Sequence, residues 1–523
     1  MTWIENNKIR NIILIVVIFF ALLIRIFLSS GAIVSSDTAA YYSLAENMAK
    51  GELKIGTATD FSKIIQPGFS FFIHLFNLLV NNIELAGQLV SLACSILTIY
   101  IIYLLAKKLF GFRVALISSV LFALNPLAIW YSGSPWTESA FTFFFLAAIY
   151  LFWVILEKKK GLFWFAVLGT IVAFSYYLRI AGLSLLPVII VLIFCHNYKI
   201  KERNIRKSIL SAAVFLSAVI LVILPYLIFL FQEKGSFSLT GQQDYAVVLN
   251  NQHKTEEMDT EKERDQFLYR LNEDRTDYQI NGLDGNKINS SIKVILERFL
   301  SNLGYNIKFV FGVFGFEIIL TLFAMYYYRK KYKNLRKIWF LLIWIPFYLI
   351  IYYFGRPYFR YYFPLSPIII ILSSLGISFL TSKVNTAFLR KSFFGLLIFI
   401  LLSFQLCVFV YNDYSFQLFS LFKTSEAKSF GLRIKEEAGN DQKIMSTEWL
   451  ITYYARGIHY PLPVDDYDSI LEFSRNRDIS HLLLYEPRDR DLRPKLDFLY
   501  DVKENNDVRL LFQEKGFYYF EIK

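Results

Sequence analysis

Long apolar segments recur along most of the chain, and many are close to the roughly 20 residues that a membrane-spanning helix needs. Short polar or basic segments separate them. About eleven spans are predicted, at 12–28, 84–106, 114–131, 137–156, 162–178, 181–197, 208–231, 304–328, 338–354, 362–381 and 392–411. A shorter apolar segment, 68–80, is typical of an interfacial or re-entrant helix. The pattern therefore predicts a polytopic α-helical membrane protein.

The pattern changes after residue 411, where short apolar segments alternate with polar ones. KIMST at 443–447 and HLLLY at 481–485 predict strands, and 466–478 predicts a helix between them. The segments VRLLFQ and FYYFEI on either side of EKG predict a closing β-hairpin, and 424–438 predicts an amphipathic helix. A small α/β domain is therefore expected at 412–523, since about 100 residues suffice for a separate core.

Charge along the loops predicts the orientation in the membrane. If the N-terminus is cytoplasmic, the inner loops carry the basic clusters, among them 158–160 and 329–337, and the short outer loops carry few basic residues. An odd number of spans then places the C-terminal domain outside the cytoplasm. The expected protein is a multi-pass protein of the cell (plasma or inner) membrane. Its transmembrane domain is 1–411, with long outer loops at 29–83 and 232–303.

Composition agrees with a membrane protein and bears on which partners and metals are expected. Hydrophobic residues make up 55% of the 523 residues, and charged residues only 19%. The net charge of +12 is explained by the cytoplasmic loops, so no nucleic-acid partner is expected. The five histidines are scattered without an HxxxH or HExxH motif, and no CxxC motif occurs. A histidine-based zinc site and a disulfide framework are therefore not predicted.

Ionisable residues gather at the predicted outer ends of the spans. Each one alone is explained by snorkelling or pairing, and the carboxylate of the first loop is also explained as a helix N-cap. Together, two carboxylates and several arginines at one depth predict a binding site for a lipid phosphate, which Arg binds through bidentate hydrogen bonds. The residues are Arg25, Asp37, Glu138, Arg179, Arg356 and Arg360.

Asp37 is the candidate with the most specific chemistry. It follows the first span by about nine residues, so its carboxylate is expected at the outer membrane interface. There it could accept a proton from a hydroxyl nucleophile or bind a divalent cation. Asp37 and Glu138 are the expected ligands if a divalent cation is bound, and metal dependence is left open.

These residues, in this order, resemble the GT-C superfamily of membrane glycosyltransferases. The similarity is greatest to the bacterial branch related to protein O-mannosyltransferases and aminoarabinose transferases. The matching positions are Arg25, Asp37, Tyr41, the helix end at Gly51, 66–68, the apolar segment 69–80, Glu138, 360–364 and Pro367. The tail segment STEWLITYYARGIHYPLP and the final hairpin resemble the same group. There is no WWD motif, which argues against the oligosaccharyltransferase branch.

The chain departs from that family pattern at two places in the first loop. Thr38 follows Asp37, where the family often has a second acidic residue. Gln66 precedes the loop proline, where the aminoarabinose transferases have a lysine, and Lys63 lies three residues earlier.

The resemblance implies transfer of a sugar from a polyprenyl-phosphate donor to an acceptor hydroxyl on the outer face of the membrane, with inversion. The acceptor would belong to a lipid, a cell-surface glycan or a protein. Asp37 would act as general base, assisted by Glu138. The remaining site residues implied are Arg356, Arg360, Arg179 and Lys63 for the donor phosphate, and Tyr41, Arg25 and Tyr361 for substrate.

Two other functions fit a polytopic protein of this kind. A transporter or flippase of lipid-linked glycans predicts charges near the bilayer midplane, broken helices and internal repeats. A polymerase or ligase of lipid-linked glycans predicts key residues mainly in large late loops. The early position of Asp37 and the charges at the outer ends of the spans favour the glycosyltransferase.

Overall fold

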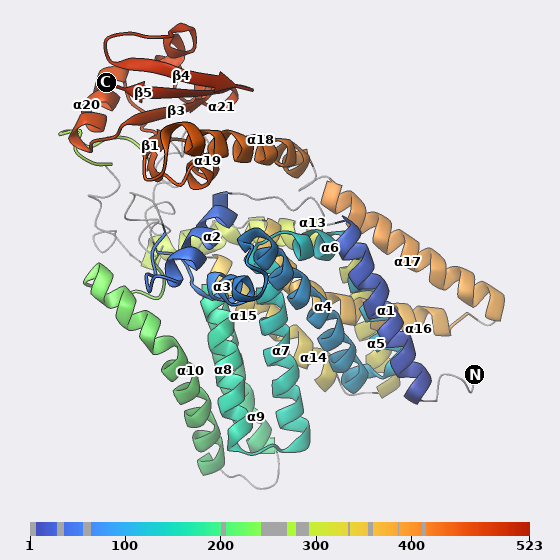
Figure 1. Ribbon diagram of the computed structural model, residues 1–523. Helices are drawn as coiled ribbons and strands as arrows, with labels where there is room; N and C mark the ends of the chain where they lie inside the picture. The colour runs from blue at the N-terminus through green and yellow to red at the C-terminus, as the bar shows by residue number, and fades with distance from the viewer. Residues whose placement is uncertain are drawn as a thin grey trace. The chain divides into compact units, whose positions relative to one another are not determined.

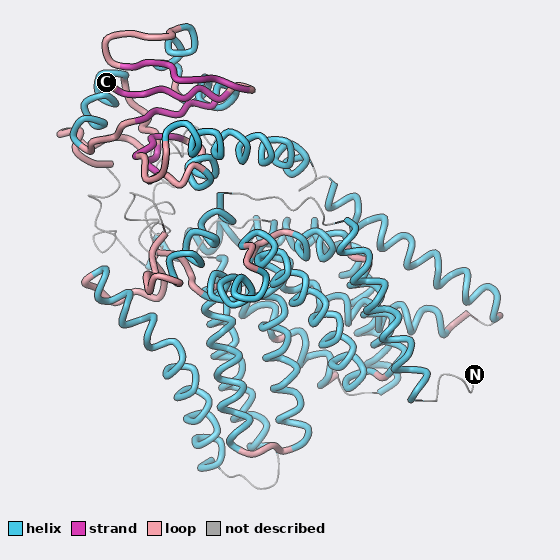
Figure 2. The backbone as a smooth tube through the Cα atoms, in the orientation of Figure 1, coloured by secondary structure: helices cyan, strands magenta, loops and turns pink. Residues whose placement is uncertain are grey.

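The protein is described here by a computed structural model. It describes residues 7–28, 36–55, 64–199, 205–241, 269–278, 292–332, 335–353, 359–384, 386–410 and 415–523. The chain forms two compact units, which Figures 1 and 2 show as a helical part and a part that contains a sheet. Unit 1 comprises Met1–Ala32, Leu75–Phe237 and Ser291–Gln417, and unit 2 comprises Ile33–His74, Ser238–Ser290 and Leu418–Lys523.

Unit 1 is built from helices. They are α1 (Asn7–Leu28), α4 (Ile83–Phe110), α5 (Phe112–Ala123), α6 (Pro126–Gly133), α7 (Thr137–Lys158), α8 (Leu162–Leu178), α9 (Leu185–Lys199), α10 (Ile205–Lys234), α13 (Ile292–Tyr332), α14 (Arg336–Leu342), α15 (Trp344–Tyr353), α16 (Ser366–Ser382) and α17 (Ala387–Phe409). Two 3₁₀ helices, Ile180–Ser184 and Phe359–Leu365, precede α9 and α16. Helix α3 (Gly68–Val80) contributes residues to both units.

Each of the eleven predicted spans coincides with a helix or with two consecutive helices. By length and composition, seven of the described helices are able to cross a membrane. The consecutive helices α5 and α6, bent by 58°, would make an eighth span. Helix α8 and the segment Ile180–Cys195 are shorter apolar helices. A multi-pass helical membrane protein is confirmed, and the count of eleven spans stays a prediction.

Glycines allow pairs of these helices to approach closely. A Cβ atom added to Gly376 of α16 would lie 2.2 Å from the backbone oxygen of Leu320 in α13. At Gly169 of α8, the added atom would lie 2.5 Å from the backbone oxygen of Phe215 in α10. Small residues are what lets helix backbones meet in membranes, where dispersion contacts drive packing. These two contacts therefore fix how α13 lies against α16 and α8 against α10.

Unit 2 contains a five-stranded mixed sheet with strand order β2-β1-β3-β5-β4. Strand β1 pairs in parallel with β2 and β3, and β5 pairs antiparallel with β3 and β4. The strands are β1 (Lys443–Ser446), β2 (Ile458–Pro461), β3 (His481–Tyr485), β4 (Val508–Glu514) and β5 (Phe517–Ile522). The helices are α2 (Ser36–Met48), α18 (Ser415–Ala438), α19 (Trp449–Tyr454), α20 (Tyr467–Asn476) and α21 (Glu486–Leu492).

The predicted α/β character of the tail is confirmed. The two predicted strands correspond to β1 and β3, the hairpin to β4 and β5, and the two predicted helices to α18 and α20. The sequence analysis missed β2, because its four residues, IHYP, end in a proline and follow α19 almost directly. Pro461 is tolerated there because β2 lies at the edge of the sheet.

Unit 2 also includes chain from the two long loops, which the predicted domain 412–523 did not contain. Leu271 and Tyr278 lie in the same apolar core as Phe473 and Leu482, and the Tyr278 hydroxyl donates a 2.5 Å hydrogen bond to the carbonyl of Pro461. Burial raises the pKa of Tyr278 well above its ordinary value. Residues 269–278 are therefore anchored to the C-terminal sheet.

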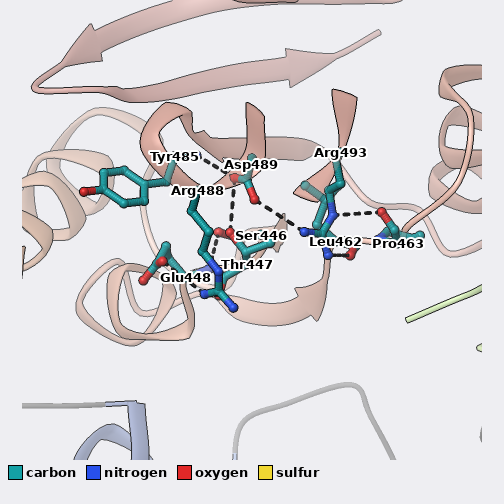
Figure 3. A network of polar contacts seen from close by, with 9 residues as sticks. All are labelled: Ser446, Thr447, Glu448, Leu462, Pro463, Tyr485, Arg488, Asp489 and Arg493. Atoms are coloured by element: carbon teal, nitrogen blue, oxygen red, sulfur yellow. Dashed lines mark hydrogen bonds and ion pairs between the residues drawn. The ribbon is translucent and has the colours of Figure 1, made fainter. Parts of the chain in front are cut away.

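A buried polar network joins the segments that follow the parallel strands (Figure 3). The Asp489 carboxylate accepts hydrogen bonds from the Tyr485 backbone N–H at 2.7 Å and the Thr447 hydroxyl at 3.1 Å. It also pairs with Arg493, at 3.5 Å, and Arg493 donates to two carbonyl oxygens just after β2. This network fastens the carboxyl edge of β1, β2 and β3 together.

Candidate functional site

Glu138 lies in the first turn of α7, and its side chain is only 1% exposed. The segment before it, from the end of α6 to Trp136, turns the chain sharply, and the Ser139 hydroxyl fastens this turn by donating to the carbonyl of Tyr131 at 2.8 Å. A carboxylate at a helix N-terminus is stabilised by the helix dipole. The local sequence thus places a buried acidic group at the beginning of a membrane helix.

Two arginines from distant parts of unit 1 meet this carboxylate. Arg179 follows the last residue of α8, forms an ion pair with Glu138, and donates from Nε to the Thr137 hydroxyl at 2.7 Å. The Nε atom of Arg360, in the 3₁₀ helix Phe359–Leu365, lies 3.8 Å from Oε1 of Glu138. The structure therefore brings together three of the residues that the sequence analysis selected.

Aromatic rings surround the two guanidinium groups. Arg179 and Arg360 lie 5.3 Å and 5.7 Å from the ring centroid of Tyr361, and Arg360 lies 5.4 Å from that of Trp136. Such cation–π contacts favour a fixed position for a partly desolvated arginine. The Tyr348 hydroxyl donates to the carbonyl of Tyr361 at 2.7 Å and so holds the 3₁₀ segment.

The cluster formed by Glu138, Arg179, Arg360 and Tyr361 has one negative and two positive charges, so its net charge is positive. Arg179 is 13% exposed and Arg360 31% exposed on their side chains. An arginine that keeps part of its surface accessible beside a net positive charge is suited to an anionic group such as a phosphate. The same charge disfavours a divalent cation at Glu138. In the described part of the chain, no group of three or more His, Cys, Asp or Glu residues could hold a metal.

Asp37 and Tyr41 lie in unit 2, on α2. Asp37 is exposed and lies in the first turn of the helix, as its second residue rather than its N-cap. Tyr41 is half-buried and packs edge-on against Phe69, with 5.2 Å between the ring centroids. These two predicted site residues therefore share one helix of unit 2, whereas Glu138 and its partners belong to unit 1.

Helix α2 is attached to the C-terminal domain by a polar and an aromatic contact. The Glu46 carboxylate accepts hydrogen bonds from Arg456 at 2.6 Å and from the Tyr453 hydroxyl at 3.3 Å. The hydrogen bond to Glu46 raises the pKa of Arg456 above its ordinary value. Tyr42 lies against Tyr453, with 6.3 Å between the ring centroids. The helix that carries Asp37 is thus positioned by residues of α19 and the turn after it.

Arg25 has a role that the sequence analysis did not predict. Its side chain is fully buried, and it donates to the Ser95 hydroxyl at 3.0 Å and to the carbonyl of Ala123 at 2.9 Å. The guanidinium thereby fastens α1 to α4 and α5. These contacts assign Arg25 to the architecture of unit 1. The substrate role that the family resemblance implied for Arg25 stays a prediction.

Two of the predicted phosphate-binding residues, Lys63 and Arg356, lie outside the described residues. Their roles stay predictions.

Sequence analysis also missed a buried acidic residue within a span. Glu317 of α13 is fully buried, and its Oε1 atom accepts a 2.6 Å hydrogen bond from the side-chain amide of Gln405 in α17. The available signal was a single acidic residue inside the apolar segment 309–324. Ionisable residues in such positions are expensive and usually have a function.

Comparison with known proteins relates both the sequence and the fold to membrane glycosyltransferases. Residues 66–229 match the family model described as dolichyl-phosphate-mannose-protein mannosyltransferase. This segment extends from Gln66, just before the first-loop proline, to α10 and includes Glu138 and Arg179. No curated protein matches the chain in sequence.

Solved structures match nearly the whole chain. The apo oligosaccharyltransferase of Archaeoglobus fulgidus is 14% identical, with a TM-score of 0.61 over 94% of this chain and 71% of that chain. The same enzyme, AglB, in complex with an inhibitory peptide and a dolichol-phosphate has a TM-score of 0.55 at 14% identity, over 91% and 70%. Its complex with Zn and sulfate has a TM-score of 0.56 at 14% identity, over 89% and 67%.

ArnT from Cupriavidus metallidurans bound to undecaprenyl phosphate is 10% identical, with a TM-score of 0.56 and 97% of each chain covered. AglB and ArnT are both GT-C glycosyltransferases, so the fold of this chain is the GT-C fold. The resemblance inferred from the order of charged residues is confirmed at the level of the fold. That the match extends to the archaeal oligosaccharyltransferase was not expected from the sequence, because the WWD motif is absent.

Proposed function

We propose that this protein is a glycosyltransferase that moves a sugar from a polyprenyl-phosphate donor to an acceptor hydroxyl on the outer face of the membrane. The observation that supports this most directly is the buried Glu138 with Arg179 and Arg360 around it, at the beginning of a helix in a GT-C fold. Solved relatives of that fold contain dolichol-phosphate or undecaprenyl phosphate. A lipid phosphate is the anion that such a cluster would meet in a membrane.

The proposed reaction is a single displacement at the anomeric carbon. The acceptor oxygen forms the new bond to that carbon, and the bond from the carbon to the phosphate oxygen breaks. Its electron pair leaves with the polyprenyl phosphate, and the anomeric configuration inverts. The hydroxyl proton passes to a carboxylate, because an alkoxide does not form at neutral pH without a base.

Residue roles follow from this chemistry. Asp37, exposed on α2, is the proposed general base, and Glu138 assists by holding Arg179 and Arg360 in place. The two arginines bind the donor phosphate and stabilise the charge that develops on it as the bond breaks. Tyr41 and Tyr361 are proposed to contact substrate.

The proposed setting is the cell membrane, with the N-terminus in the cytoplasm and the C-terminal domain outside. The acceptor belongs to a lipid, a cell-surface glycan or a protein. A divalent cation stays a prediction for Asp37. The charges around Glu138 argue against a cation there.

The test uses purified protein in lipid nanodiscs with a panel of radiolabelled polyprenyl-phosphate sugars. Sugar transfer or release is compared between the wild type, Asp37→Asn and a matched control, Asp478→Asn. Asp478 is 92% exposed and has positive φ, a conformation that asparagine also tolerates, and its ion pair with Lys443 lies at the surface, so the control removes a charge at small structural cost.

Transfer by the wild type and the control, with a loss of roughly 100-fold or more in Asp37→Asn, supports a base at this position. Equal transfer by all three proteins would remove Asp37 from the mechanism. Binding of a lipid-linked sugar without turnover, equal in all three, would instead favour a transporter or flippase. Polymerisation of the donor glycan itself would favour a polymerase.

A further inference from the structure

A second buried carboxylate site lies among the helices of unit 1, around Glu317. A small cavity there is lined by polar side chains from four elements: Asn125 before α6, Glu317 of α13, Ser366 of α16 and Gln405 of α17. The cavity volume is about 10 Å³, which is room for about one water molecule or an ion of similar size.

Three oxygen atoms at this cavity have no hydrogen-bond partner within the described residues. They are Oε2 of Glu317, Oε1 of Gln405 and Oγ of Ser366, and their residues are 0%, 5% and 2% exposed. A buried polar atom without a partner costs about 1–3 kcal/mol or more, so an occupant that satisfies all three is favoured. All three atoms are able to donate electron pairs, and the occupant must therefore be positively charged or a hydrogen-bond donor.

Charge decides between these possibilities. No salt bridge reaches Glu317 from any lysine, arginine or histidine that the structure describes, although burying an ionised carboxylate without a counter-charge costs several kcal/mol. A water molecule satisfies hydrogen bonds but leaves the charge. Protonation of Glu317 would also remove the charge, but the added proton needs only one acceptor and would leave the cavity unfilled. A bound cation neutralises the charge, fills the cavity and satisfies all three oxygens.

We propose that this cavity is a binding site for one small monovalent cation of the size of Na⁺, coordinated by Glu317, Gln405 and Ser366. One carboxylate balances a single positive charge, which favours a monovalent over a divalent ion in a buried site. Oxygen ligands suit a hard cation. The backbone of α13 supports this location, because it leaves helical geometry at Phe314, which lines the cavity one turn before Glu317 (φ −125°, ψ 19°).

The site is linked to the cluster at Glu138 through one short stretch of chain. The 3₁₀ helix Phe359–Leu365 carries Arg360, which faces Glu138, and Phe363, which lines the cavity. Ser366, a proposed ligand, follows this helix directly. A cation bound to Ser366 would therefore fix the end of the segment that positions Arg360.

The proposal is tested without any activity assay. Thermal unfolding of the purified full-length protein is measured while NaCl replaces choline chloride at constant ionic strength, and bound ²²Na⁺ is counted directly. The variants are Glu317→Gln, which keeps the shape and removes the charge, and Ser366→Ala. Glu436→Gln, at an exposed position of α18, is the matched control.

A saturable rise of the unfolding temperature with NaCl is expected for the wild type and the control, with one Na⁺ bound per chain. Glu317→Gln should lose the rise, and Ser366→Ala should need about 10-fold more Na⁺. The proposal is overturned if Na⁺ has no effect beyond that of choline, or if Glu317→Gln responds like the wild type. Stability that depends on pH but not on Na⁺ would equally overturn it, in favour of a protonated Glu317.

Discussion

Replacing Glu138 by glutamine would test whether its buried ion pair holds the candidate phosphate site together. The side chain keeps its shape but loses its charge, so Arg179 and Arg360 are left beside a neutral amide. Removing one partner of a buried ion pair costs about 3–5 kcal/mol, because the other charge remains desolvated. Glu138 is 1% exposed but Arg179 is 13% and Arg360 31% exposed, so water relieves part of this cost. Glu138→Gln is therefore expected to lower the free energy of unfolding by about 3 kcal/mol.

The double variant Glu138→Gln with Arg179→Gln separates the two roles of the pair. The double variant no longer contains the uncompensated charge of Arg179. Its loss of unfolding free energy should therefore be about 2 kcal/mol smaller than the sum of the losses in the two single variants. Sugar transfer should not recover with stability, because the phosphate ligand Arg179 is gone. Recovery of both would mean that the pair serves the fold alone.

The assay is equilibrium unfolding in mixed detergent–SDS micelles, followed by tryptophan fluorescence. The matched control is Glu157→Gln, near the other end of the same helix, where Glu157 is 41% exposed and pairs with Lys108. An exposed pair of this kind should contribute less than about 1 kcal/mol. If Glu138→Gln were no more destabilised than Glu157→Gln, the argument from burial would be refuted.

Three further predictions concern packing, pH and the attachment of α2. Gly376→Ala places a Cβ atom 2.2 Å from a backbone oxygen of α13, and should lower the free energy of unfolding by about 1–3 kcal/mol in the same assay. The control Gly395→Ala, whose added Cβ atom would have nothing within 4 Å, should lower it far less. Burial lowers the pKa of His459 to about 3, below its ordinary 6.5, so the stability that the neutral imidazole contributes should be lost as pH falls from 6.5 toward 3. His459→Gln should flatten the dependence of stability on pH in that range, measured by hydrogen exchange of unit 2. Glu46→Arg and Arg456→Glu should each increase hydrogen exchange in α2, and the double variant, which restores an ion pair with its charges exchanged, should regain part of the protection. The coupling energy between the two positions should be about 0.5–1 kcal/mol, because both side chains are partly exposed. Absence of coupling would show that the ion pair does not hold the helix.

The sequence by itself determined the elements whose causes are local. An apolar segment such as 84–106 predicts a membrane helix because its length and hydrophobicity alone favour burial in the bilayer, and α4 (Ile83–Phe110) covers the same residues. The short apolar run in HLLLY predicted β3 for a similarly local reason. The order of the charged residues and motifs along these elements, together with the predicted topology, was enough to indicate the GT-C fold.

Only the tertiary structure decided which charges meet and which serve the fold. Arg25 and Arg179 both lie near the ends of apolar segments, yet one fastens three helices and the other pairs with Glu138. The contact between Glu317 and Gln405 joins residues 88 positions apart, and no local pattern specifies it. The physical reason is that a side chain's partner depends on how helices cross, which is set by packing such as that at Gly376 over the whole of unit 1.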